Sequence, residues 1–225
     1  MVIGRRMGFS LHGRALSAEL MLPSELGARP FVLLLNNRGT GEVVAQELAR
    51  SLVRRGFGTV TLDIKQVDSG VEESRAVAVK RHLSLAQAAF DAMFEVQQSE
   101  ATALFAVGQS YGGYVAAALA ENRPLAGVVL RSPLPWPDES VESASVWHER
   151  ALSALKRSQV PVLVVSSERD ELMPLAAIKS YLAAAGGTKA HYQIAGAGHE
   201  LNRSQNRQFK RMSGEWLEAR VDLAF

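Results

Sequence analysis

Residues 108–112, Gly-Gln-Ser-Tyr-Gly, place a serine between two glycines, and Gly113 follows at once. A serine hydroxyl is a poor nucleophile at neutral pH, and it becomes reactive when a base within hydrogen-bond reach takes its proton. Glycines on both sides allow the sharp strand-to-helix turn that exposes such a hydroxyl. The pattern therefore predicts attack by Ser110 on a carbonyl carbon. The alternative is that Ser110 only caps the following helix.

Two later residues are suited to activate this serine. His199 follows two glycines in the segment Gly-Ala-Gly-His, and Asp170 lies in a polar segment after an apolar run. The imidazole would accept the serine proton, and the carboxylate would hold the imidazole in the required tautomer. Glu168 and Glu171 are rivals for the acid, and Asp170 could instead cap a helix that begins near Pro174.

The elements that must position these residues alternate between short apolar runs and longer segments of helical period. This alternation predicts a single α/β domain, residues 1–225, around a mostly parallel sheet of about eight strands with about six helices. After one or two antiparallel strands that end near Met21, strands are expected at 31–35, 59–62, 103–107, 128–130, 160–166 and 191–194. Helices are expected at 43–55, 114–121, 175–185 and 204–223, and residues 74–98 are expected to form one long helix or two stacked pieces.

Residues 74–98 also carry a prediction about burial. Five of their apolar residues recur at helical spacing and are predicted to face inward: Leu83, Ala86, Phe90, Met93 and Phe94.

Residues 133–150 interrupt the alternation with three prolines and two tryptophans, and they could form a small cap. Trp136 and Trp147 would then either line an acyl pocket or simply pack this segment against the body.

With these residues identified, the chain resembles the α/β-hydrolase superfamily, especially small members related to the dienelactone hydrolases and simple esterases. The resemblance runs from the strand at 31–35 to His199. It implies a nucleophile at Ser110, an acid at Asp170 and a base at His199, with an oxyanion hole formed by the backbone N–H groups of Tyr111 and Arg38. Two features depart from the family pattern: Asn36-Asn37 stands where many members have His-Gly, and serine replaces the cysteine nucleophile of dienelactone hydrolases.

The resemblance and the residues together predict a serine esterase that acts on a small molecule and needs no cofactor or metal. A thioesterase or peptidase on the same three residues, and a non-catalytic binding protein with the same fold, are the alternatives.

Composition excludes several other classes of protein. The chain has no cysteine, and its formal net charge of +2, with no Lys/Arg block longer than two, argues against binding to nucleic acid or to a membrane surface. No apolar stretch approaches the roughly 18 residues that cross a bilayer, and no signal peptide is recognised, so a cytoplasmic location is expected. Gly39-Thr40-Gly41 lacks the third glycine of a dinucleotide-binding loop, because Val44 occupies that position.

Overall fold

The structure is a computed structural model, and it describes residues 2–24, 29–36, 40–68, 74–96, 101–135 and 145–221. These ranges hold eight strands, six α-helices and one short 3-10 helix. In chain order the elements are β1 (Val2–Leu11), β2 (Arg14–Pro23), β3 (Arg29–Asn36), α1 (Thr40–Val53), β4 (Gly58–Asp63), η1 (Ile64–Val67), α2 (Arg75–Val96), β5 (Ala101–Gln109), α3 (Tyr111–Leu119), β6 (Gly127–Arg131), α4 (Ser145–Ser158), β7 (Val162–Ser167), α5 (Leu175–Ala184), β8 (Lys189–Ile194) and α6 (Arg203–Val221).

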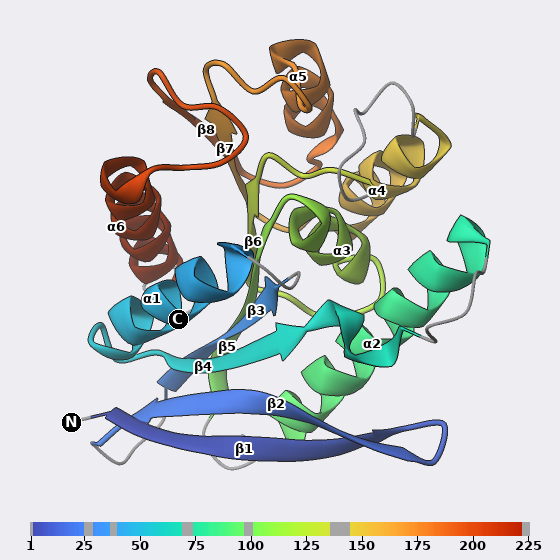
Figure 1. Ribbon diagram of the computed structural model, residues 1–225, viewed down its shortest axis with the longest axis vertical. Coiled ribbons are helices and arrows are strands. Elements are labelled where there is room, and N and C mark those ends of the chain that lie inside the picture. The colour runs from blue at the N-terminus through green and yellow to red at the C-terminus, as the bar shows by residue number, and fades with distance from the viewer. Residues whose placement is uncertain are drawn as a thin grey trace.

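All eight strands form one sheet in the order β1-β2-β4-β3-β5-β6-β7-β8 (Figure 1). The hairpin of β1 and β2 is antiparallel and β2 pairs antiparallel with β4, whereas the strands from β4 to β8 in this order are parallel. His12 and Gly13 join the hairpin with φ of 51° and 79°, the left-handed pair that a two-residue turn of type I′ requires. The predicted α/β class with a mostly parallel sheet is confirmed.

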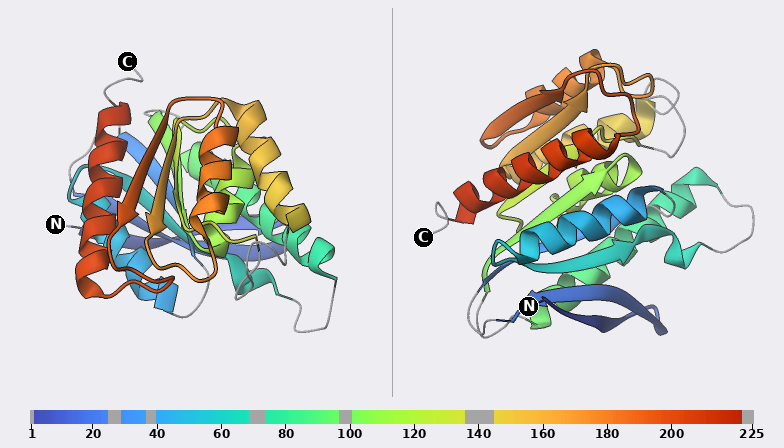
Figure 2. Two further views of the ribbon diagram at one scale, coloured as in Figure 1. Left: turned by 90° about the horizontal axis from the view of Figure 1, so that it is seen from above. Right: turned by 60° about the vertical axis from the view of Figure 1, so that its left-hand side comes forward.

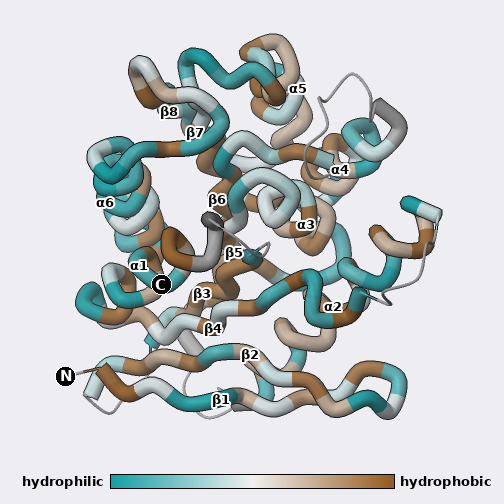
Figure 3. Tube along the Cα trace, in the orientation of Figure 1, coloured by the Kyte–Doolittle hydropathy of each residue, from teal (hydrophilic) through white to brown (hydrophobic). Residues whose placement is uncertain are grey.

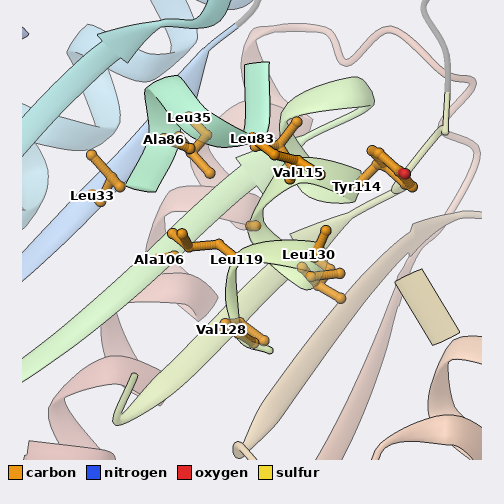
Figure 4. Close-up of a cluster of buried hydrophobic side chains, with 14 of the residues drawn as sticks. Leu33, Leu35, Leu83, Ala86, Ala106, Tyr114, Val115, Leu119, Val128 and Leu130 are labelled. Carbon is orange, nitrogen blue, oxygen red and sulfur yellow. The ribbon is translucent and has the colours of Figure 1, made fainter. Parts of the chain in front are cut away.

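Helices cover both faces of the sheet, with α1 and α6 on one side and α2 to α5 on the other (Figure 2). Alternate residues of β3 divide between the two layers: Leu33 and Leu35 pack against the α2–α5 side, whereas Val32 and Leu34 pack against α1 and α6. The central strands are accordingly apolar along their length (Figure 3), and the larger of the two cores lies beneath α3 (Figure 4). Because both faces are covered, the carboxyl edge of the sheet is where a site can form.

Helix α2 is one continuous helix, and four of its five predicted core residues are buried. Leu83, Ala86, Phe90 and Met93 are at most 7% exposed, so their prediction is confirmed. Phe94 is 47% exposed, so its predicted inward position is wrong. It follows Met93 by one residue, a rotation of about 100° around the helix, which carries it out of the buried stripe.

Helix α4 is absent from the predicted elements, because the prolines before it led us to expect an irregular segment. Its buried face nevertheless has helical spacing: Trp147 is half-buried, and Ala151, Ala154 and Leu155 are fully buried. Residues 136–144, the centre of the possible cap, lie outside the described ranges, and the cap stays a prediction. In the part of the chain that the structure describes, no helix could span a membrane.

Candidate active site

Ser110 stands at the turn between β5 and α3, one residue beyond the end of the strand. Its backbone has φ 50° and ψ −125°, a conformation that is strained for a residue with a side chain. Main-chain hydrogen bonds hold it there: its N–H donates to Arg131 O at 2.9 Å, and its carbonyl accepts from Leu134 N at 3.0 Å. The strained turn is therefore fixed by the neighbouring strand β6 and the segment that follows it.

Two glycines of the turn are required by close backbone contacts. A Cβ atom on Gly108 would lie 2.1 Å from the carbonyl oxygen of Gly112. A Cβ on Gly112 would lie 2.2 Å from the carbonyl oxygen of Leu35 in β3. Both distances are far below van der Waals contact, so any larger residue would push α3 away from the sheet.

The structure brings Ser110, His199 and Asp170 together although they are far apart in the sequence. His199 Nε2 lies 3.0 Å from Ser110 Oγ, and Nδ1 lies 2.9 Å from Asp170 Oδ1 and 3.1 Å from Oδ2. An ionised carboxylate can only accept, so Nδ1–H donates to Asp170, and Nε2 is left to accept from the serine hydroxyl. Ser110 occupies the N-cap position of α3, but its side chain makes no capping bond to the described backbone.

Asp170 is almost completely buried and follows β7 in a turn that its own side chain stabilises. Besides His199, Oδ1 accepts the backbone N–H groups of Leu172 at 3.1 Å and Met173 at 3.0 Å. Burial acts to raise the pKa of Asp170, but the hydrogen bonds from His199 and Met173 outweigh it, and the pKa is lowered. The carboxylate therefore stays ionised beside the imidazole.

Ser132 also lies beside this carboxylate and acts to lower its pKa.

The alternatives to Asp170 have other positions. Glu168 Oε2 accepts the N–H of Gly196 at 2.6 Å, so this side chain supports the segment before His199. The N-cap of α5 is Pro174, and Asp170 does not occupy that position. Of the polar residues considered after β7, Asp170 is the one that contacts the imidazole.

Arg131, which the sequence did not single out, connects the segments that carry Ser110 and His199. Its backbone carbonyl accepts the Ser110 N–H, and its guanidinium donates to the backbone carbonyl of His199. The side chain is buried, and burial lowers its pKa against the opposing effect of the Asp170 and Glu200 carboxylates. A guanidinium remains protonated at neutral pH despite such a shift, so Arg131 is a buried cation next to the ionised acid.

Two of the four remaining predicted site residues, Tyr111 and Trp147, lie within the described residues. Tyr111 is the first residue of α3, where backbone N–H groups and the positive end of the helix dipole face the serine. Trp147 is a residue of α4, and its side chain packs against the larger core. Arg38 and Trp136 lie outside the described residues, so their predicted roles stay predictions.

A polar cleft of about 740 Å³ lies over β1, β2 and the carboxyl ends of β3 and β4. It begins at Asn36, on the strand next to β5, and extends over β4 and β2 to β1. Arg5, Arg6, Glu19 and Asp63 line it, so the cleft offers charges of both signs. Such a lining does not suit an aliphatic acyl chain, which needs apolar surface.

Known proteins are similar to this chain in sequence and in fold. Residues 37–220 match the profile of a family described as an alpha/beta hydrolase domain. Two uncharacterized proteins from strains of Mycobacterium tuberculosis are 25% identical over 182 residues, which cover 77% of this chain and 64% of theirs. The chain thus spans less than two thirds of the length of these curated relatives.

Solved structures show the same fold at low identity. A dienelactone hydrolase from Anabaena variabilis is 19% identical, with a TM-score of 0.76 over 97% of this chain and 98% of its own. An alpha-beta serine hydrolase homologue from Coxiella burnetii is 16% identical, with a TM-score of 0.72 over 95% and 97% of the two chains. Because the profile match spans most of the sequence, the chain belongs to the alpha/beta hydrolase family.

Proposed function

We propose that the chain is a serine hydrolase that cleaves a small carboxylic ester through an acyl-enzyme. The observation that carries this proposal is the continuous hydrogen-bonded array of Ser110, His199 and Asp170, with distances of 3.0 Å and 2.9 Å. All three residues follow the carboxyl ends of parallel strands, the edge at which α/β sheets bind ligands.

In the first step, Ser110 Oγ attacks the ester carbonyl while His199 Nε2 takes the hydroxyl proton. The imidazole becomes a cation, and the ionised Asp170 at Nδ1 stabilises that charge. The tetrahedral intermediate then collapses, the C–O bond to the alcohol breaks, and His199 returns the proton to the departing alcohol. Ser110 is left as an acyl ester.

The negative charge on the carbonyl oxygen needs donors that are already in place. We expect the backbone N–H of Tyr111, at the start of α3, to be one of these donors, which its place directly after Ser110 supports. A second donor would come from the segment after β3, for which Arg38 is the residue implied by the family resemblance. This arrangement would stabilise the oxyanion through backbone N–H groups already in place.

In the second step, water replaces the alcohol. His199 takes a proton from water, the resulting hydroxide attacks the acyl carbon, and the acid leaves as the proton returns to Ser110 Oγ. The names of the solved relatives support this class of substrate, since a dienelactone is a cyclic ester and a serine hydrolase shares the fold.

The test is hydrolysis of p-nitrophenyl acetate by the wild type, by Ser110→Ala and by Ser180→Ala. Ser180 is a partly exposed serine on α5 whose hydroxyl donates to the helix backbone at Ala176 O, so its variant is a matched control. We expect Ser110→Ala to lose turnover and Ser180→Ala to keep it. Equal turnover by wild type and Ser110→Ala would refute the proposal.

Parallel thioester and amide substrates decide between the alternatives on the same residues. A higher kcat/KM for a thioester or an amide than for the matched ester would make the chain a thioesterase or a peptidase. If a fluorophosphonate probe left Ser110 unlabelled in the folded protein, the non-catalytic binding protein would be the correct interpretation.

A further inference from the structure

A second hydrogen-bonded chain reaches the residue after the nucleophile from the opposite side. Asp68 follows η1, His82 lies on α2, and Tyr111 begins α3. His82 Nε2 lies 2.7 Å from Asp68 Oδ1, and His82 Nδ1 lies 2.8 Å from the hydroxyl of Tyr111. Three segments that are distant in the sequence thus meet at one phenol.

The proton positions follow from the carboxylate. Asp68 accepts, so Nε2–H donates to it, and with the ring proton on Nε2, Nδ1 accepts the hydroxyl proton of Tyr111. Burial raises the pKa of Tyr111, which keeps its phenol protonated as a donor. Each donor in this chain therefore faces an acceptor.

The Tyr111 side chain is held on its faces as well as at its hydroxyl. Tyr111 is fully buried and His82 is 4% exposed. The ring of His82 meets the ring of Tyr111 edge-on with 5.5 Å between the centroids, and the ring of Tyr114 stacks against it at 5.8 Å with an interplanar angle of 15°. The half-exposed carboxylate of Asp68 also forms an ion pair with Arg81, whose Nη2 lies 3.7 Å from Asp68 Oδ1.

Few side chains within the turn are available to hold its backbone in place. Residues 108, 112 and 113 are glycines, so they contribute no side chain, and the Ser110 hydroxyl is bonded to His199. Glycines give the backbone more conformations to lose, and the strained φ of Ser110 would relax if the next peptide rotated. The carbonyl of that peptide already accepts from Leu134 N, and the buried Tyr111 side chain adds a second restraint at its other end.

We propose that Asp68, His82 and the Tyr111 hydroxyl form a positioning chain that fixes the Tyr111 peptide for binding of the oxyanion. This inference rests on the proposed function, in which the Tyr111 N–H meets the developing charge. The three side chains do not contact the substrate, and they act on catalysis through the backbone of Tyr111.

The test uses Tyr111→Phe and His82→Leu, which remove the bond from its two ends, together with the double variant. Tyr114→Phe is the matched control, because it removes a buried phenol hydroxyl one turn later that has no hydrogen-bond partner among the described residues. Each protein is assayed for kcat and KM on p-nitrophenyl acetate and for the Ki of n-butylboronic acid, whose tetrahedral adduct places an oxygen at the oxyanion position. Thermal unfolding is measured for each protein.

We expect each single variant to lose about tenfold in kcat with KM little changed, as a displaced oxyanion donor would produce. The Ki of the boronic acid should rise by the same factor. The double variant should lose no more than the worse single variant, because both changes break one bond. Tyr114→Phe should keep the wild-type kcat.

A wild-type kcat and Ki in folded Tyr111→Phe would overturn the inference and leave the proposed function intact, as would an equal loss in Tyr114→Phe. If His82→Leu does not fold, Tyr111→Phe, which removes one oxygen atom, decides by itself. A wild type no more active than Ser110→Ala would refute the proposed function, and the inference would fail with it.

Discussion

The change Asp170→Asn tests whether the Asp170 carboxylate orients His199, because asparagine has almost the same shape as aspartate. The carboxylate oxygen Oδ1 accepts the N–H groups of Leu172 and Met173, and an asparagine that keeps both bonds must turn its carbonyl oxygen toward them. Its NH2 then occupies the place of Oδ2, 3.1 Å from His199 Nδ1. A donor at that point favours the tautomer with the proton on Nε2, which faces Ser110 and can no longer accept the serine proton.

The expected loss follows from that tautomer. The equivalent change in the Ser-His-Asp template lowers kcat by about 10⁴. Because Oδ1 also lies 2.9 Å from Nδ1, part of the productive tautomer survives in this site. We therefore expect a fall of about 10³ to 10⁴ in kcat, or about 4 to 5.5 kcal/mol of lost transition-state stabilisation.

The assay is steady-state hydrolysis of p-nitrophenyl acetate at pH 8 by wild type, Asp170→Asn and Glu171→Gln. Glu171 adjoins Asp170 in the same turn and was its rival in the sequence. Urea unfolding checks that each variant remains folded. The assignment would be refuted by Asp170→Asn within tenfold of the wild-type kcat, or by an equal loss in Glu171→Gln.

Three further predictions concern stability and the neighbours of the array. Gly112→Ala should lower the free energy of unfolding by about 2 to 4 kcal/mol, measured in urea, since its Cβ would meet the backbone of β3 at 2.2 Å; a change below about 0.5 kcal/mol would contradict the packing described. The lowered pKa of Asp170 adds stability that is complete above its unfolded pKa of about 3.9 and is lost as the pH falls through the folded pKa. Between pH 5 and pH 3 the wild type should therefore lose more unfolding free energy than Asp170→Asn, and equal losses would argue against the shift. Arg131→Met should lower kcat about tenfold, because the His199 carbonyl loses its tether; unchanged kcat in the folded variant would show that the tether is dispensable.

Local patterns were sufficient to predict the sheet and the segments that meet at its edge. Apolar runs identified β3, β5 and β7 to within a few residues, and the glycines around Ser110 indicated a tight turn whose steric cause is now visible in the backbone contacts. Because parallel strands end at a common edge, Asp170 and His199 could be expected near Ser110 before any distance was known.

Long-range side-chain contacts were beyond the reach of such patterns. Arg131 ends an apolar strand and His82 lies in an amphipathic helix, and neither position has a spacing that indicates its partner. Their roles follow from how β6 and α2 pack against the site, which depends on tertiary structure. The burial of Arg131 next to an ionised acid could not be read from a sequence in which arginines are usually exposed.

Helix α4 shows a different limit. Its stripe from Trp147 to Leu155 has the helical period, but the proline-rich residues before it dominated the interpretation of the segment. Phe94 shows the converse error, since helical period alone cannot say where the buried stripe of α2 ends.

The most direct test of the central claim is to trap the acyl-enzyme by rapid acid quench during turnover of p-nitrophenyl acetate. Peptide mass spectrometry then locates the acyl group. The mechanism predicts one acetyl group on the peptide that contains Ser110 in the wild type, and none in Ser110→Ala. Turnover without acylation of Ser110, or acylation of another residue at the rate of turnover, would contradict it.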